Sequence, residues 1–334
     1  MGVMRLALAL AVLLSHAGLR VQGLNPGVTA VIGFYLISGY VMTGLIQRHF
    51  ATPTHIPAFY VDRLLRIMPQ YLVYAGATLV WFLVTGTHTA FLARSLGVAD
   101  LLNNLAVVPL NFYMFTGADQ FTLIPPAWSL GAELQFYLLA PCMVLWPRLG
   151  LVLAVASLGV HAAAVIGRLH TDWFGYRLLA GVLWVFGAGM LLFVLQRSRP
   201  ALAFLMAAAA PLVALAIYLL LRHDGLHAVP YNREILIGWG LGLPLLHWLS
   251  RRRGGRLDTL AGDVSYGVFL NHFLLLWLLF PASGLSPAQF TLLAIASILL
   301  AGFTQTVFER PALAWRRRLR LSSRNASPTQ HHRD

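Results

Sequence analysis

The chain has 334 residues, of which 58% are hydrophobic and 10% charged, and its mean hydropathy is +0.72. Soluble globular domains carry about 25% charged residues, so this chain lacks the polar side chains to cover a water-soluble globule. The formal charge of +13 comes entirely from arginine, because the sequence contains no lysine. These values exclude an ordinary soluble domain and leave the lipid bilayer as the solvent.

Apolar stretches long enough to cross a bilayer follow one another along the chain. A spanning helix needs about 20 predominantly apolar residues, and helices satisfy their backbone hydrogen bonds within lipid. The sequence therefore predicts an all-α, polytopic integral membrane protein with about ten transmembrane helices. The predicted spans are 3–21, 27–47, 68–86, 127–147, 149–167, 174–195, 200–221, 233–250, 262–282 and 287–308.

Residues 101–116 are the exception to this pattern. They are apolar but include Asn103, Asn104, Pro109 and Asn111. Because three amide side chains and a proline suit a lipid-facing helix poorly, we expect this segment to belong to an outside loop. It would re-enter the membrane there or lie on its surface.

Arginines alternate between rich and poor loops along the chain. With the N-terminus inside, the inside loops and the tail carry runs such as 251–256 and 316–320, whereas the outside loops carry scattered arginines. This positive-inside bias predicts that both termini are cytoplasmic and that the number of spans is even. Residues 1–18 also resemble a signal peptide, but their removal would spoil the alternation, so we expect them to form the first helix. Nucleic-acid binding is a weaker interpretation of the same runs.

The sequence predicts one membrane-embedded domain over residues 1–315. Residues 316–334 are basic and polar, which predicts a disordered cytoplasmic tail that follows the membrane surface. Cys142 is the only cysteine, so neither a disulfide within the chain nor a cysteine-based metal site can form. No paired-histidine metal motif and no glycine-rich phosphate loop is present, and we predict no bound metal.

Arg5 and His16 lie 11 positions apart in the first predicted helix. Because an α-helix turns by about 100° per residue, both side chains lie on one face, roughly 16 Å apart along the axis. Arg5 is then at the inner surface and His16 in the outer half of the bilayer. Ionisable groups within a membrane are functional candidates by default. A snorkelling arginine and a hydrogen-bonded core histidine would explain the pair without a function.

Arg63 and Arg66 are neighbours on one helical face within FYVDRLLRIMP at 59–69. Two guanidinium groups presented together suit phosphate, because each can donate two parallel hydrogen bonds to it. Positive-inside anchoring explains the same residues without a ligand, and the two interpretations have similar weight. Asp62 is placed to pair with one of the two arginines.

Glu133 lies about two turns into the helix that follows Pro125 and Pro126, at a depth similar to that of His16. A carboxylate beside a histidine can orient the ring and raise its basicity, so we expect Glu133 to act on His16. A protonated glutamic acid in a helix–helix contact is the alternative. For Asn271 and His272, in the middle of a later span, interhelical hydrogen bonding is the simplest explanation.

These motifs together resemble the acyltransferase-3 family of bacterial membrane O-acyltransferases, which modify sugars of surface glycans. The resemblance covers Arg5 and His16, GFYLISGYVMTGLI at 33–46, FYVDRLLRIMP at 59–69, PAWSLGAELQFYLLAP at 126–141, GDVSYGVFLNHF at 262–273 and ERP at 309–311. Three positions depart from it: Asp62 replaces a common basic residue, Leu134 a frequent second glutamate and Asn271 a frequent tryptophan.

The resemblance implies transfer of an acyl group, commonly acetyl, from cytosolic acyl-CoA. It implies that His16 is the catalytic base with Glu133 as a site residue, and that Arg5, Arg63 and Arg66 lie on the acyl-CoA side. Further residues of the motifs that we expect to line the site are Ser38, Tyr137, Asn271 and His272.

The sequence thus predicts a multi-pass enzyme of the bacterial cytoplasmic (inner) membrane. It would acylate a hydroxyl of a sugar or glycan on the outer side, with acyl-CoA as co-substrate and no permanently bound cofactor. A transporter or a lipid or glycan flippase could use the same buried polar residues, but the repeats and broken helices usual in transporters are not evident. A non-catalytic scaffold would leave the alignment of Arg5 with His16 unexplained.

Overall fold

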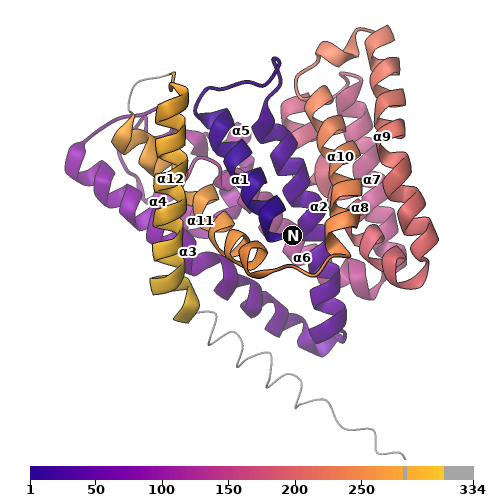
Figure 1. Ribbon diagram of the computed structural model, residues 1–334. Coiled ribbons are helices and arrows are strands. Elements are labelled where there is room, and N and C mark those ends of the chain that lie inside the picture. The colour runs from indigo at the N-terminus through magenta and orange to yellow at the C-terminus, as the bar shows by residue number, and fades with distance from the viewer. Residues whose placement is uncertain (281–283, 312–334) are drawn as a thin grey trace, which may run out of the picture.

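The computed structural model describes residues 1–280 and 284–311. Within these ranges the chain forms helices and no β-strand, which confirms the predicted all-α class (Figure 1). The helices are α1 Gly2–His16, α2 Pro26–His49, α3 Ile56–Thr85, α4 Val98–Ala106, α5 Tyr113–Thr116, α6 Ala127–Leu145, α7 Pro147–Val165, α8 Leu179–Ser198, α9 Pro200–His223, α10 Asn232–Ser250, α11 Arg256–Leu279 and α12 Pro287–Thr304.

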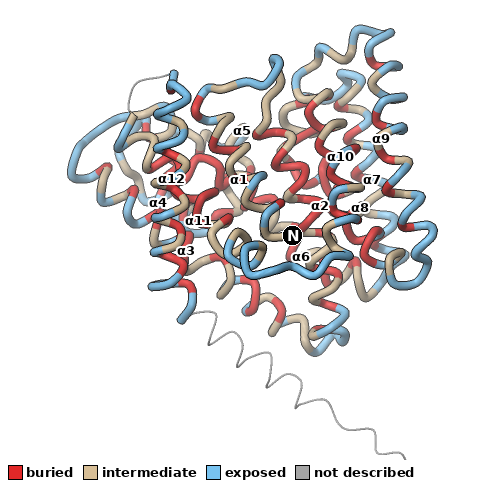
Figure 2. The backbone as a smooth tube through the Cα atoms, viewed as in Figure 1, coloured by how far each residue is buried: buried red, intermediate tan, exposed pale blue. Residues whose placement is uncertain are grey.

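Helices are present at all ten predicted spans. Among the described residues, eight of these helices are both long enough and apolar enough to cross a membrane. α1 is shorter, and α10 does not combine the required length and hydropathy. Large apolar side chains on the outer faces are exposed, for example Leu212, Leu220 and Leu299 at 67–69%, and Figure 2 shows the exposed outer face of α9. Such a surface requires lipid around it, so the protein is a multi-pass membrane protein.

Two of the helix boundaries that differ from the sequence prediction affect the site. α1 ends at His16, and the following turn contains Gly18 at φ +84°, a backbone conformation that ends a helix and favours glycine. α3 begins at Ile56, so the arginine motif at 59–69 belongs to the spanning helix and continues through Pro69. Arg63 and Arg66 therefore lie within the spanning helix rather than just before it.

The segment predicted not to form an ordinary span is bent. It forms α4 and then Val108–Thr116, two pieces at 104° to each other with Val107 between them at φ +64°. Asn104 and Asn111 are buried in it and donate to backbone carbonyl oxygens. The amide side chains that interrupt the apolar pattern thus satisfy the backbone around the bend.

α1 lies at the centre of the site because it packs against both α2 and α11. α1 and α11 run parallel: Gly2 lies against the backbone of Asp258 and Gly262 at one end, and His16 contacts His272 at the other. We call the end that contains Met1 the N-terminal end of the bundle and the other the opposite end. Small residues allow such close crossings.

The predicted basic tail, 316–334, and the predicted domain boundary at residue 315 lie outside the described residues. A π-helix, Gln305–Glu309, follows the C-terminus of α12 and contacts α3. It lies at the N-terminal end of the bundle. This contact places Glu309 beside the arginine motif.

Candidate active site

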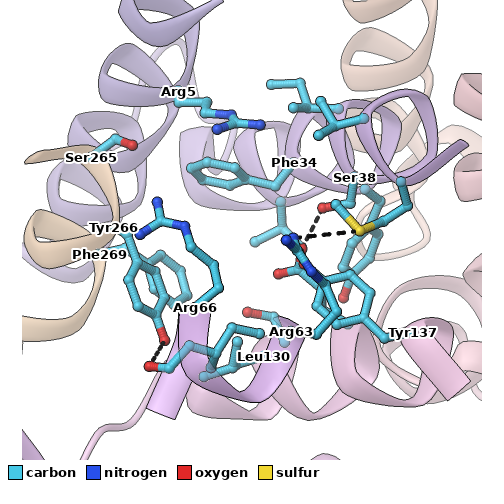
Figure 3. A pocket seen from close by; sticks show the side chains of 18 of the residues that line it. Arg5, Phe34, Ser38, Arg63, Arg66, Leu130, Tyr137, Ser265, Tyr266 and Phe269 are labelled. Carbon is cyan, nitrogen blue, oxygen red and sulfur yellow. Dashed lines mark hydrogen bonds between the residues drawn. The ribbon is translucent and has the colours of Figure 1, made fainter. Parts of the chain in front are cut away.

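A cavity of about 330 Å³ opens between α1, α2, α3, α6 and α11, and we call it the arginine cavity (Figure 3). Its polar lining side chains come from five different helices. They are Arg5, Tyr35, Ser38, Arg63, Arg66, Ser129, Glu133, Tyr137, Ser265 and Tyr266. The structure therefore brings together six of the residues singled out in the sequence: the three arginines, Ser38, Glu133 and Tyr137.

The three guanidinium groups of this cavity differ in whether they form an ion pair. Arg63 forms an ion pair with Asp62, and Arg66 forms one with Glu309. Both carboxylates are almost fully buried, with side-chain exposures of 1% and 2%. Arg5, within the described part of the chain, has no hydrogen bond or ion pair from its side chain. Arg5 is thus the one guanidinium of this cavity without a carboxylate partner, and all its donors are available to a ligand.

Glu133 lines the arginine cavity, and its hydrogen-bond partners are residues of that cavity rather than His16. Its carboxylate accepts hydrogen bonds from the Ser38 hydroxyl and, at 2.6 Å, from the Tyr137 hydroxyl. The expectation that Glu133 acts on His16 is therefore wrong in this structure. Matched depth along two helices was misleading, because it says nothing about which way each side chain points around its own helix.

His16 lines a second, smaller cavity of about 70 Å³ at the opposite end, which we call the histidine cavity. Its polar lining comes from α1, the 17–25 loop, α6 and the segments before α8 and α10. The polar and aromatic residues are Ser15, His16, Asn25, Trp128, Ser129, Tyr176, Arg177 and Tyr231. His16 is exposed at that end, so a molecule can reach its ring.

The partner of His16 is His272, which is buried at 1% exposure. Nδ1 of His16 lies 3.0 Å from Nε2 of His272, and Nδ1 of His272 lies 3.1 Å from the Val268 carbonyl oxygen. The two rings are nearly coplanar, at 9°, with centres 5.2 Å apart. Together with the short nitrogen contact, that separation means that the rings meet edge to edge, as an N–H···N hydrogen bond requires.

The two cavities adjoin each other. Val31, Ser129 and Phe269 line both of them, so one layer of side chains separates the arginine cavity from the histidine cavity. A ligand anchored among the arginines could reach His16 by displacing these side chains. Among the described residues, no group of three or more histidine, cysteine or acidic side chains could hold a metal ion.

Arg177 is a site residue that the sequence analysis did not single out. It lines the histidine cavity, pairs with Asp172 at 2.8 Å and lies 4.5 Å from the centre of the Trp128 ring. The sequence showed only an arginine in an outside loop. Its spacing of five from Asp172 was the one available signal, and it is a weak one.

His272 lines neither cavity but contacts His16, and its chain neighbour Asn271 lies outside both cavities as well. Asn271 is fully buried and bonds to Ser297 and to the Tyr74 hydroxyl. These contacts join α11 to α12 and α3. Consecutive residues of a helix point about 100° apart, which explains why one faces the site and the other a helix interface.

The acyltransferase domain model of the acyltransferase-3 family matches residues 1–305. The chain belongs to this family. It is therefore an acyltransferase.

Two relatives illustrate the match. An uncharacterized protein of Aquifex aeolicus is 36% identical over 161 residues, which is 47% of this chain and 72% of that protein. A Staphylococcus aureus protein named "Putative O-acetyltransferase" is 27% identical over 152 residues, 42% of this chain and 24% of its own length. The match thus spans about a quarter of the staphylococcal relative. No solved structure matches the chain.

Proposed function

We propose that this acyltransferase moves an acyl group, acetyl in the simplest case, from cytosolic acyl-CoA to a hydroxyl of a sugar or glycan at the opposite end of the bundle. The observation that carries the proposal is a pair of hydrogen-bonded histidines, His16 and His272, beside an arginine-lined cavity. We call this pair the histidine relay. The staphylococcal relative's name, O-acetyltransferase, supports acetyl as the group and oxygen as the acceptor atom.

The relay defines which nitrogen of His16 is the base. The Val268 carbonyl can only accept, so Nδ1 of His272 carries a hydrogen and donates to it. Neutral His272 then has a bare Nε2, which accepts from Nδ1–H of His16. Nε2 of His16 is consequently left with its lone pair free. Such orientation of a base by a further group is the usual arrangement in acyl transfer.

The arginine cavity supplies the donor side of the proposal. Acyl-CoA carries phosphates and a long thioester arm, and Arg5, Arg63 and Arg66 present three cations around one space (Figure 3). Guanidinium groups bind phosphate oxygens through pairs of charge-assisted hydrogen bonds. The arm would then extend past Val31, Ser129 and Phe269, and its thioester would reach His16.

The chemical step follows from this geometry. Nε2 of His16 removes the proton of the acceptor hydroxyl as its oxygen attacks the thioester carbonyl carbon. The carbon–sulfur bond breaks, the thiolate takes the proton back from the imidazolium, and the products are the ester and free CoA. Arg177 lies beside this step and is held by Asp172 and Trp128, so it can stabilise negative charge that develops there.

The topology completes the proposal. The positive-inside bias of the sequence supports a cytoplasmic N-terminal end, with the arginine cavity on that side. The histidine cavity then faces the outer side of a bacterial cytoplasmic membrane, where glycans are modified. Both named relatives are bacterial, which supports this membrane.

Replacement of His16 by alanine tests the function. We expect kcat to fall by roughly 10²–10⁴-fold, because general-base catalysis contributes about that much, while the affinity for acetyl-CoA stays the same. The measurement is release of CoA and labelling of membrane glycans by purified protein in lipid vesicles. Activity of the purified, folded His16→Ala protein equal to that of the wild type would refute the proposal.

A further inference from the structure

A third cavity, which the proposed reaction does not use, lies between α9 and α10. It is a groove of about 420 Å³ with walls of apolar side chains such as Leu215, Leu236 and Leu241. Leu215 and Leu241 are 53% and 59% exposed on the outer face of the bundle. The groove therefore opens toward the lipid, and a hydrocarbon chain can enter it sideways from the bilayer.

Arg233 lines this groove where the groove reaches the opposite end of the bundle, the end that contains the histidine cavity. It is the second residue of α10, and its guanidinium forms no hydrogen bond or ion pair within the described residues. An unpaired cation at the border of the hydrocarbon is costly and attracts an anionic group. A guanidinium suits phosphate in particular. Apolar walls with one cation at the mouth match a phosphate on a hydrocarbon chain.

The groove adjoins the histidine cavity at the 17–25 loop and at the start of α10, where neighbouring residues of the chain line one or the other. In the loop, Leu24 lines the groove and the next residue, Asn25, lines the histidine cavity. At the start of α10, Arg233 lines the groove and Tyr231 lines the histidine cavity. A group attached to a phosphate at Arg233 would therefore lie over Asn25 and Tyr231, on the way to His16.

The backbone at this border is strained. Gln22 and Tyr231 are two of the three non-glycine residues with positive φ in the described chain, at 51° and 69°. One lines the groove and the other the histidine cavity. Non-glycine residues with positive φ cost free energy and cluster where binding requires a particular backbone path. Strain at both sides of this border is consistent with a binding role for it.

We propose that the groove binds the lipid anchor of the acceptor, a sugar joined through phosphate to a long hydrocarbon chain. The chain lies between α9 and α10, the phosphate contacts Arg233, and the sugar extends past Asn25 and Tyr231 so that its hydroxyl meets Nε2 of His16. This inference rests on the proposed function, because it names the acceptor class for the same base.

Binding of a lipid phosphate tests the groove without the reaction. The probe is polyprenyl phosphate added to the purified protein in neutral detergent, with polyprenol and phosphatidylglycerol as comparisons. We expect polyprenyl phosphate to stabilise the wild type against heating and Arg233→Gln to weaken its binding roughly ten-fold or more, the effect of one charge-assisted contact. Arg222→Gln, an exposed arginine at the same end that does not line the groove, is the matched control.

The groove itself is tested by Leu241→Trp, which fills it, and by Leu245→Trp, which adds the same side chain one turn away on an exposed position outside it. The first should prevent stabilisation by polyprenyl phosphate and the second should not. Equal binding of phosphatidylglycerol and polyprenyl phosphate would overturn the proposal, because the groove would then hold bulk membrane lipid. Unchanged binding in Arg233→Gln or Leu241→Trp would overturn it as well.

Acyl transfer in membranes separates this inference from the proposed function. With labelled acetyl-CoA, we expect wild-type label in the organic-solvent extract, which contains lipid-linked sugars. Arg233→Gln should lose most of that label, and His16→Ala all of it. Label that reaches only the aqueous fraction, equally in wild type and Arg233→Gln, overturns the lipid anchor and keeps the acyltransferase. No labelling by folded wild type refutes the proposed function, whereas the binding result still stands on its own.

Discussion

The arginine cavity and the histidine cavity differ in the partners of their functional side chains, which are charged for two of the arginines and neutral for His16. In the arginine cavity, two of the three cations are neutralised by buried carboxylates and the third, Arg5, is unpaired. In the histidine cavity, the reactive ring is held by a second neutral ring and a backbone carbonyl. The first arrangement attracts an anion, and the second keeps a base neutral and oriented.

This difference indicates that binding and proton transfer are separated in space. A base among the three arginines would be harder to protonate, because a nearby like charge disfavours the imidazolium. The one arginine of the histidine cavity, Arg177, is paired with Asp172. Glu133, which the sequence placed beside the histidine, is instead held by Ser38 and Tyr137 among the arginines. Substitutions at the two cavities should therefore change different kinetic constants.

His272→Ala should give the largest effect after loss of the base itself. It removes the acceptor that holds His16 in one tautomer, so we expect kcat to fall roughly 100-fold with little change in KM for acetyl-CoA. His272→Gln, whose amide oxygen can accept from His16, should recover part of kcat. The measurement is steady-state kinetics together with the pH profile of kcat.

The control for His272 is His161→Ala. His161 is also a buried histidine whose Nδ1 lies 3.1 Å from a backbone carbonyl, that of Gly175, but its ring packs against Trp184 and not against His16. Both variants should lower thermal stability, and only His272→Ala should lower kcat. Equal kcat in the two folded variants would mean that His272 has only a structural role.

Arg5→Gln should weaken acetyl-CoA binding by about ten-fold, because it removes the one cavity guanidinium that is not neutralised by a carboxylate. Since Arg5 has no carboxylate partner, the thermal stability should stay close to that of the wild type. Isothermal titration with CoA measures the affinity, and Arg148→Gln, an exposed arginine at the N-terminal end, is the control. An unchanged affinity would assign the phosphates to Arg63 and Arg66.

Arg66→Gln should differ from Arg5→Gln in stability. It leaves Glu309 with 2% side-chain exposure and no cation. A buried carboxylate without its partner is destabilising, here on the order of 2 kcal/mol because Arg66 itself is partly exposed. The melting temperature in detergent should fall, and the double variant Arg66→Gln with Glu309→Gln should recover most of the loss. No recovery would show that Glu309 does not depend on Arg66.

The fold could be predicted from the sequence more completely than the site. Hydropathy and arginine placement predict the helices because both depend on local composition, and each predicted span contains one. The arginine motif and Glu133 were also found, because intramembrane charge is visible in a sequence. The pairing of His16 with His272 was missed, since it depends on the parallel packing of α1 on α11, which are 256 positions apart at this contact.

Asn271→Leu gives the smallest expected effect and tests whether motif position or cavity position defines the site. Asn271 neighbours His272 and lies in a family motif, yet its contacts are with Ser297 and Tyr74 at a helix interface. Interhelical hydrogen bonds in membranes contribute about 1 kcal/mol, so the melting temperature should fall slightly while kcat and KM stay unchanged. A ten-fold loss of kcat in the folded variant would extend the site through α11 toward α12. The division between a proton-transfer face and a packing face of α11 would then no longer hold.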